Sequence, residues 1–216
     1  MLITFEGIDF CGKSVQIEQL INRLQQHQIP YILLREPGGT IIAEKIREVL
    51  LTRETEAMSP ITEYLLYSAA RAQLVRQQIE PALARGWLVI CDRFADSSTA
   101  YQGYGRGIDL KLVQQINAFA TNGIVPQLTF LIDIDLEEME RRKKQGRKLD
   151  RMENEERSFF ERVRQGFLKM AAQEAERFYL IDGKRAIHSI ADEVWTQVQQ
   201  RWMRFNQMSS AVDHKF

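Results

Sequence analysis

The stretch Gly7-Ile8-Asp9-Phe10-Cys11-Gly12-Lys13-Ser14 matches the pattern G-x-x-x-x-G-K-[ST] in full and directly follows the apolar residues 1–5. After it, apolar residues recur at helical spacing, at Ile17, Leu20, Ile21 and Leu24. Glycines let the backbone curl so that successive N–H groups point at one anion, and a helix N-terminus adds further N–H groups. The stretch therefore predicts a phosphate-binding loop between a strand and a helix. The alternative, a chance glycine-rich turn, does not account for this context.

Two side chains of this loop carry the expected chemistry. Lys13 would place an ammonium group against the β- and γ-phosphates of a bound nucleotide, and the Ser14 hydroxyl would bind Mg²⁺. The predicted nucleotide site is the whole loop, made of Gly7, Ile8, Asp9, Phe10, Cys11, Gly12, Lys13 and Ser14.

The composition limits the class of protein. The chain has 216 residues, 44% of them hydrophobic, which suits one compact domain. Its 29 basic and 29 acidic residues balance, so we expect no nucleic acid and no membrane as partner. A basic leader and a membrane-length apolar run are both absent from the sequence, which indicates a cytoplasmic protein. Cys11 and Cys91 lack the spacing of a disulfide framework or zinc site, so we expect two unpaired thiols.

Short β-rich apolar runs alternate with longer amphipathic stretches, which is the pattern of an α/β fold. The predicted strands are 2–6, 31–35, 87–92, 128–133 and 178–182, with helices between them. Right-handed crossovers would place every loop that follows a strand at one edge of a parallel sheet, where open α/β folds bind ligands. We expect a single domain over 1–208, with a last helix over about 187–205 and a flexible tail over 209–216.

A second candidate anion contact follows the second strand, in Arg35-Glu36-Pro37-Gly38-Gly39-Thr40. The proline and the two glycines end regular structure where the Arg35 guanidinium leaves the sheet edge. Arg47 follows on a predicted helix over 41–51 and could lean toward the same ligand. The alternative is an ordinary turn with a solvated arginine.

The next helix is predicted over 60–85, since Pro60 is a favoured first helical residue. Apolar spacing predicts a buried stripe made of Leu65, Leu66, Ala69, Ala72 and Val75. Tyr67 and Arg71 are four residues apart and would share a face, where a ring for stacking beside a guanidinium suits a planar base. The alternative is a tyrosine at the core boundary beside a surface arginine.

The third predicted strand ends in Cys91-Asp92-Arg93-Phe94, which carries an acid and a base to the sheet edge facing the phosphate-binding loop. Asp92 could hold Mg²⁺ through water, and Arg93 could bridge the donor and acceptor phosphates as a phosphoryl group moves. The alternative is a structural ion pair. The stretch that follows, 95–103, is dense in hydroxyl and amide groups of the kind that read base or sugar edges.

A strongly basic run follows the helix predicted over 136–144, and Gly146 interrupts it. Its members are Arg141, Arg142, Lys143, Lys144, Arg147, Lys148 and Arg151. A mobile flap that closes over a triphosphate would have this composition. The alternative is a solvated helix end whose charge is balanced by the acidic residues around it.

Taken together, these segments closely resemble the bacterial thymidylate kinase family. The resemblance covers nearly the whole chain, and the order Arg-Glu-Pro-Gly-Gly-Thr after a phosphate-binding loop is far more specific than the loop itself. It implies a three-layer P-loop NTPase fold with a five-stranded parallel sheet and a short lid at about 145–153. It also implies ATP and dTMP as substrates, dTDP as product, Mg²⁺ as cofactor and a homodimer formed through helices.

Residue by residue, the resemblance assigns an acceptor site. Asp9 would lie near the sugar and phosphate of dTMP, and Tyr67 would stack on thymine. Tyr101 would crowd the sugar 2′ position. The phosphate would be held by Arg35, Arg47 and Arg93, and the thymine edges would be bound by Arg71, Ser98 and Gln102, with Ser97 as a further substrate-binding residue. Within that set, Arg71 and Gln102 would offer donors to the thymine carbonyls.

The resemblance also implies a catalytic set, made of Lys13, Asp92, Arg93, Arg147 and Arg151, with Ser14 and Asp92 at the metal. Phe10 stands where some relatives carry an arginine in the loop, so the resemblance assigns the catalytic cation to the lid, to Arg147 or Arg151. Val15 stands where a second Ser or Thr is usual, and Phe10-Cys11 replaces a pair that is usually small. Both departures would alter the shape of the loop.

Two rival classes stay open at this stage. One is a kinase for another nucleotide or nucleoside on the same fold, and the other is a P-loop switch or regulatory ATPase without a metabolite acceptor. A switch protein has no evident use for a second pocket built from Tyr67, Arg71 and Gln102. A nucleoside kinase has no use for arginines that await an acceptor phosphate.

Overall fold

The computed structural model describes residues 1–55, 57–144 and 149–213. Its five strands form one parallel sheet in the order β2-β3-β1-β4-β5. The strands are β1 (Leu2–Glu6), β2 (Tyr31–Arg35), β3 (Leu88–Asp92), β4 (Leu128–Asp133) and β5 (Phe178–Asp182). The predicted α/β fold with a five-stranded parallel sheet is confirmed.

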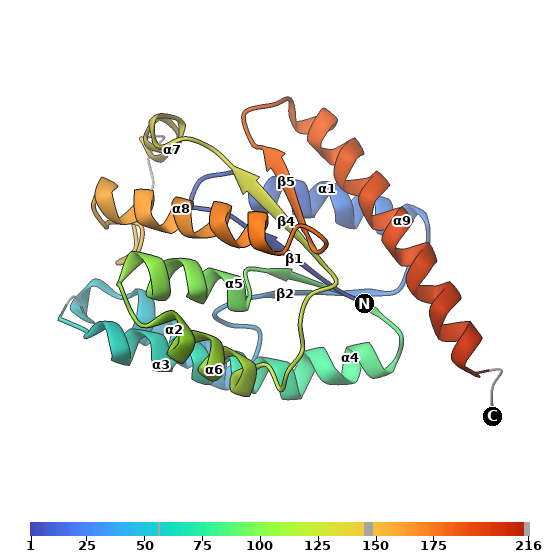
Figure 1. Cartoon of the computed structure of the whole chain (residues 1–216), viewed down its shortest axis with the longest axis horizontal. Helices are drawn as coiled ribbons and strands as arrows, with labels where there is room; N and C mark the ends of the chain where they lie inside the picture. Colours follow the sequence, from blue (N-terminus) through green and yellow to red (C-terminus); the bar gives the residue numbers. More distant parts are fainter. Residues whose placement is uncertain (56, 145–148, 214–216) are drawn as a thin grey trace.

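Helices cover both faces of the sheet and give the molecule three layers (Figure 1). The helices are α1 (Lys13–Gln26), α2 (Ile41–Leu51), α3 (Pro60–Leu74), α4 (Glu80–Ala84), α5 (Ala95–Ser98), α6 (Leu110–Ala120), α7 (Leu136–Lys143), α8 (Arg157–Gln173) and α9 (Ile187–Asp213). A 3₁₀ turn, Arg53–Thr55, follows α2, and two π-helical segments, Val75–Ile79 and Thr99–Gly105, extend α3 and α5. Helices α1 and α9 pack side by side, as do α2 with α3 and α3 with α6.

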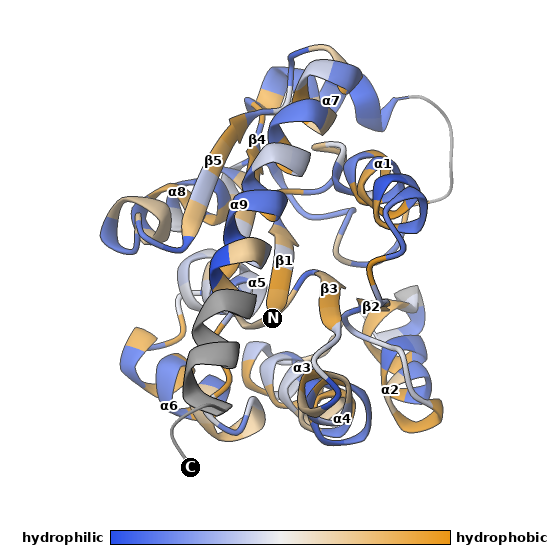
Figure 2. Ribbon diagram, turned by 90° about the vertical axis from the view of Figure 1, so that its right-hand side faces the viewer, coloured by the Kyte–Doolittle hydropathy of each residue, from blue (hydrophilic) through white to orange (hydrophobic). Residues whose placement is uncertain are grey.

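The three central strands are buried along their length, because helices cover them on both sides. Figure 2 shows this as apolar colour along β1 and β3 in the interior. The Phe5 and Phe130 rings lie 5.1 Å apart in the largest apolar cluster, which joins the sheet to α1, α8 and α9. A second cluster joins β1, β2 and β3 to α3 and the π-helical segment after it. The sheet is therefore a rigid base for the loops at its edge.

The register of the strands brings three loops together. Asp92 at the end of β3 pairs with Arg35 of β2 on one side and with Phe5 of β1 on the other. The loops that leave β1, β2 and β3 therefore begin at the same level of one sheet edge, as the sequence predicted.

The helix predicted over 60–85 differs from the observed one in two ways. It is divided into α3, a π-helical segment and α4, and of its predicted buried stripe only Val75 is fully buried, while Leu66 and Ala72 are half-buried. Leu65 is 51% exposed and Ala69 is also exposed. The buried side of α3 carries Glu63, Tyr64, Ser68, Ala70, Arg71 and Leu74 instead. Apolar spacing selected the wrong face, because two buried charges on the inner face find partners elsewhere in the fold.

The C-terminal helix continues past its predicted end at residue 205 and runs to Asp213. The backbone of 209–213, expected to be a flexible tail, is helical, whereas 214–216 lie outside the described residues. Among the residues that the structure describes, no helix is long and apolar enough to cross a membrane.

Candidate active site

A cavity of about 710 Å³ opens at the edge of the sheet where the loops after β1, β2 and β3 meet. Most of the predicted site residues line it: Asp9, Phe10, Cys11, Gly12, Lys13, Ser14, Arg35, Arg47, Tyr67, Arg71, Asp92, Arg93, Ser97, Ser98, Tyr101 and Gln102. Gly7 and Ile8 form the buried base of the loop beneath it. The fold thus gathers groups from across the first half of the chain around one space.

The phosphate-binding loop has a backbone that only glycine allows at two points. Gly7 has φ +139°, and a Cβ there would lie 2.4 Å from the Ile132 carbonyl oxygen. Gly12 caps α1 in the left-handed region, with φ 103° and no side-chain cap. The first N–H groups of α1 are therefore left for an anion in the cavity.

The Lys13 side chain folds back over this loop. Its Nζ donates to the carbonyl oxygens of Gly7 and Ile8, at 3.2 Å each. The side chain is buried at the cavity wall, whereas Ser14, in the first turn of α1, is exposed. An ammonium and a hydroxyl thus stand next to each other at one end of the cavity, as a nucleotide with its metal requires.

Arg93 lies between this loop and the rest of the cavity, in a left-handed backbone conformation with φ 69°. Its guanidinium donates to the Gly7 carbonyl at 2.9 Å, to Ser97 Oγ at 3.1 Å and to Asp9 Oδ1 at 2.7 Å. The Tyr101 hydroxyl donates to the other Asp9 oxygen at 2.8 Å. Burial alone would raise the pKa of Asp9, but the charges of Arg93 and Lys13 and these hydrogen bonds outweigh it and lower the pKa. Asp9 is therefore ionised at neutral pH.

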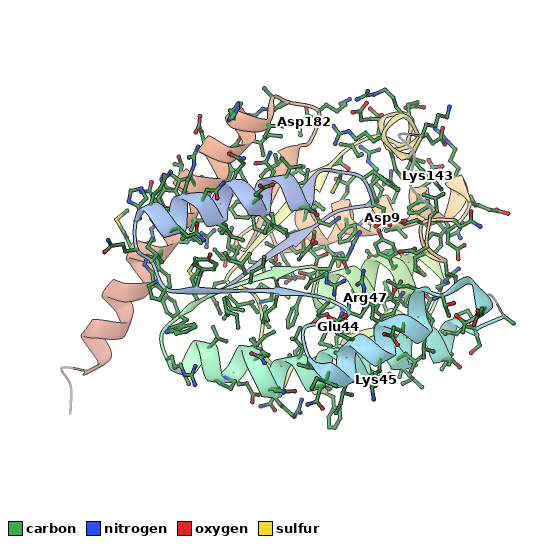
Figure 3. All side chains as sticks on the ribbon, turned by 180° about the vertical axis from the view of Figure 1, so that it is seen from behind. Asp9, Glu44, Lys45, Arg47, Lys143 and Asp182 are labelled. Atoms are coloured by element: carbon green, nitrogen blue, oxygen red, sulfur yellow. The ribbon has the colours of Figure 1, made fainter. Side chains whose placement is uncertain are left out.

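Two more guanidinium groups face the cavity from β2 and α2. Arg35 donates to Glu44 at 2.9 Å, and Arg47 donates to the Pro37 carbonyl at 2.9 Å. Burial and the neighbouring charge of Arg35 lower the pKa of Arg47, because two cations share a small space. In Figure 3, Arg47 lies on α2, and Asp9 lies above it in the view, on the loop after β1. An anion between Arg35, Arg47 and Arg93 would relieve their mutual repulsion.

Arg71 is the most buried cation of the cavity, at 1% exposure. It forms an ion pair with Glu36 at 2.7 Å and donates to Ser98 Oγ at 3.0 Å, to Asn117 Oδ1 at 3.2 Å and to the Phe94 carbonyl at 3.1 Å. The sequence analysis missed Glu36 as its partner, although Glu36 stands in the loop after the second strand. A buried arginine requires an acid, and this loop supplies it.

Gln102 differs from its predicted role as a donor to the ligand. Its Nε2 donates to Glu63 at 2.9 Å, from the π-helical segment after α5 to α3. Tyr67, predicted to stack on a base, borders the same part of the cavity and is half-buried. Burial and the nearby Glu63 charge raise the pKa of Tyr67, so its hydroxyl stays neutral.

The oxygen donors of the cavity suit Mg²⁺. Ser14 and the half-buried Asp92 offer a hydroxyl and a carboxylate, which are the hard ligands that Mg²⁺ prefers. Within the described residues, no group of three or more His, Cys, Asp or Glu is placed to hold a metal by itself. A Mg²⁺ ion here would take its other ligands from phosphate oxygens and water.

The predicted lid is described only in part. Arg147 lies outside the described residues, while Asp150, Met152 and Glu153 line the cavity. Arg151 is turned away from the cavity. It donates to the Leu50 carbonyl at 2.9 Å and to Glu63 at 2.7 Å, and it is 7% exposed. Sequence reasoning missed this contact, because Glu63 is 88 positions away along the chain.

Arg142, at the end of α7, is a site residue that the sequence analysis placed only in a basic run. It donates to the carbonyls of Phe10 and Cys11, at 3.2 and 3.0 Å, and to that of Gly183 at 2.8 Å. The signal available was its place at the end of the helix that follows the fourth strand. Arg142 braces the phosphate-binding loop from the side of α7.

The two cysteines are free, as predicted, and both are buried. Cys11 lies in the phosphate-binding loop, and Cys91 lies on β3. Burial raises the pKa of the Cys91 thiol well above its usual value, so it stays protonated and unreactive.

Comparison with known proteins identifies relatives over most of the chain. Residues 5–194 match the family model described as thymidylate kinase. A curated thymidylate kinase from Fervidobacterium nodosum is 50% identical over 195 residues, covering 90% of this chain and 96% of the relative. One from Caldanaerobacter subterraneus is 46% identical, covering 92% and 94%. The crystal structure of thymidylate kinase from Ehrlichia chaffeensis matches with a TM-score of 0.75 at 34% identity, covering 92% of this chain and 98% of that one.

Proposed function

The chain belongs to the thymidylate kinase family, and we propose that it transfers the γ-phosphoryl group of ATP to dTMP, which yields ADP and dTDP. One structural observation supports the proposal in addition to the family membership. The phosphate-binding loop and three arginines, Arg35, Arg47 and Arg93, line the same cavity. Two phosphate sites in one cavity suit a reaction that moves a phosphoryl group between two nucleotides.

The donor half of the reaction rests on the loop after β1. Its backbone N–H groups and Lys13 would bind the β- and γ-phosphates of ATP, and Ser14 and Asp92 would hold Mg²⁺, directly or through water. When bound, Mg²⁺ would neutralise the negative charge that develops on the phosphate oxygens during the transfer. Arg93 reaches across from the β3 side and would stabilise the moving phosphoryl group.

The acceptor half rests on the loops after β2 and β3. Arg35, Arg47 and Arg93 would bind the 5′-phosphate of dTMP and hold it in line with the donor. Asp9 and Tyr101 would face the sugar. The base would lie against Tyr67, with Arg71, Ser97, Ser98 and Gln102 around its edges. For the catalytic cation of the lid we propose Arg147, or Arg151 once it has left Glu63.

ADP release in a coupled assay tests the proposal. With ATP, Mg²⁺ and dTMP, we expect rapid ADP formation that requires all three, and chelation of Mg²⁺ should stop it. The Lys13→Ala variant should lose activity by about 10²-fold or more while keeping its fold. ADP release at the same rate without any acceptor would favour a P-loop ATPase instead, and release that requires a different nucleotide would favour another kinase.

We further propose a homodimer formed through α2, α3 and α6, of which α3 packs against both of the others. They expose large apolar side chains: Ile41, Ile42, Val49, Ile61, Leu65, Leu112 and Phe119. Exposed apolar side chains concentrated on neighbouring helices favour burial against a second copy. We also propose a cytoplasmic location. It agrees with the proposed kinase reaction, because ATP is available in the cytoplasm and free thiols stay reduced there.

A further inference from the structure

We infer that Glu63 is a positioning residue for base selection. By holding the amide nitrogen of Gln102, it turns the amide oxygen toward the base of the acceptor, which must then offer a ring N–H. The inference rests on the proposed function, because it takes the cavity beside Gln102 as the site of the acceptor base. It concerns how the site rejects cytosine.

The first step is the chemistry of the contact. Gln102 Nε2 lies 2.9 Å from Glu63 Oε1, and both side chains are buried, at 2% and 1% exposure. An ionised carboxylate only accepts hydrogen bonds, so the Gln102 amide must face it with its nitrogen. Desolvation alone would raise the pKa of Glu63. The hydrogen bonds and the charge of Arg106, followed by the hydrogen bonds of Gln102 and Arg151, outweigh it and lower the pKa. Glu63 is therefore a carboxylate at neutral pH, and the orientation of the amide follows.

The second step is the rigidity of the carboxylate. Arg106 donates to both oxygens of Glu63, at 3.1 and 2.9 Å, and Arg151 donates to one of them at 2.7 Å. The Arg106 guanidinium also lies 4.6 Å from the centre of the Phe159 ring and pairs with Glu155 at 2.6 Å. Because Arg106 alone donates to both oxygens, the Glu63 carboxylate keeps its orientation toward the Gln102 amide even when Arg151 leaves.

The third step concerns what the ligand meets. Within the described part of the chain, Gln102 Oε1 accepts no hydrogen bond, and the residue lines the cavity. Ser98 lines the same cavity, and its Oγ accepts from Arg71 at 3.0 Å, which leaves the Ser98 hydroxyl hydrogen to donate. A hydroxyl donor and an amide acceptor match a base edge with a carbonyl beside a ring N–H. Thymine and uracil have this edge, whereas cytosine presents an acceptor nitrogen and an amino donor.

The Glu63→Gln variant is the main test, with kcat/KM measured for dTMP and dCMP. An amide at position 63 either donates or accepts, so the Gln102 amide would be free to turn its nitrogen toward the base. We expect the dTMP-to-dCMP ratio to fall by about tenfold or more, with dCMP improving in absolute terms. A structural role alone would lower both values together, and an unchanged ratio would overturn the inference.

Two more variants test the inference in case Glu63→Gln does not fold. Gln102→Met keeps Glu63 and its two arginines but removes the acceptor, so the ratio should again fall by about tenfold or more. Glu155→Gln is the matched control, since it removes the other acid on Arg106 and leaves the contact between Glu63 and Gln102 intact. Its ratio should stay at the wild-type value. An unchanged ratio in Gln102→Met, or an equal fall in Glu155→Gln, would overturn the inference.

The wild-type protein separates this inference from the proposed function. If it does not phosphorylate dTMP, the proposed function fails before any variant is compared. If it phosphorylates dTMP and the variants keep its selectivity, the function stands and the role of Glu63 is rejected.

Discussion

The Arg93 guanidinium lies 2.7 Å from the Asp9 carboxylate and joins the turn after β3 to the phosphate-binding loop after β1. Both side chains are 18% exposed, so the pair lies at the wall of the cavity rather than in the core. The carboxylate offsets part of the arginine charge while no phosphate is bound. A phosphate that enters this region would share Arg93 with Asp9, which would put the cation between the proposed donor and acceptor sites.

Replacing Arg93 should therefore abolish turnover while the protein stays folded. We expect Arg93→Ala to lose about 10²-fold or more in kcat, because it removes the cation that we propose to stabilise the moving phosphoryl group. Steady-state kinetics with a thermal melt measure both effects. Arg85→Ala is the control, since Arg85 lies at the opposite end of β3 and stacks on Trp87, 5.7 Å from its ring centre. Turnover near the wild-type value in Arg93→Ala would contradict the assigned role.

Loss of the proton from Glu6 should lower the free energy of unfolding as the pH rises. Burial, followed by the nearby Asp96 charge, raises its pKa from 4.5 to about 8, although Ser97, Arg93 and the Phe94 N–H act against the shift. Because the folded protein holds this proton more tightly than the unfolded chain, Glu6 contributes most below pH 4.5. That contribution is lost as the pH rises to about 8, by at most about 1.4 kcal/mol per pH unit.

The Glu6→Gln variant cannot lose this proton. The free energy of unfolding is measured with urea at several pH values for both proteins. The difference between the variant and the wild type should increase in favour of the variant between pH 5 and about 8. Parallel curves for the two proteins over this range would show that Glu6 does not titrate as described.

Arg151 should matter for stability as well as for any role in the lid. Its removal leaves the buried Glu63 with one cation fewer and frees the Leu50 carbonyl, so Arg151→Ala should lower the free energy of unfolding by about 1–3 kcal/mol. Arg141→Ala provides the comparison, because among the described residues Arg141 forms an ion pair with Glu138 alone, on the surface of α7, and should change stability by less than about 0.5 kcal/mol. Equal urea midpoints for wild type and Arg151→Ala would exclude the anchoring role.

The proposed dimer depends on the exposed apolar side chains of α3 and α6. Leu65 is 51% exposed and Phe119 is 80% exposed. A charge at either position would be buried without a partner in a dimer but would be solvated in a monomer. Light scattering should therefore find two chains per particle for the wild type and one for Leu65→Glu or Phe119→Glu. A wild-type protein that stays monomeric at micromolar concentration would reject the dimer.

The strands were predictable because each is a short apolar run between breaking residues. Trp87 was included in the third strand and lies just outside it. The phosphate-binding loop and the arginine that ends β2 were also predictable, since the chemistry of a phosphate requires glycines and cations at the ends of strands. These features depend on residues close together in the sequence.

The partners of the buried charges were not predictable in the same way. Arg71 meets Glu36 across 35 positions, and Glu63 meets Arg151 across 88. Helical periodicity counts apolar residues, so it took the side of α3 with Leu65 as the buried one and missed the side with Glu63 and Arg71. A charge becomes suitable for the interior only when the fold supplies its partner, and a local pattern does not contain that information.

A competition assay tests the proposed reaction most directly. The protein is incubated with ATP, Mg²⁺ and an equimolar mixture of dTMP, dCMP, dAMP, dGMP and UMP, and the nucleoside diphosphates are separated by chromatography. Apart from the ADP formed from ATP, dTDP should accumulate first and far ahead of every other diphosphate. Earlier accumulation of another diphosphate, or ADP formation with no second diphosphate, would contradict the assignment of this chain as a kinase for dTMP.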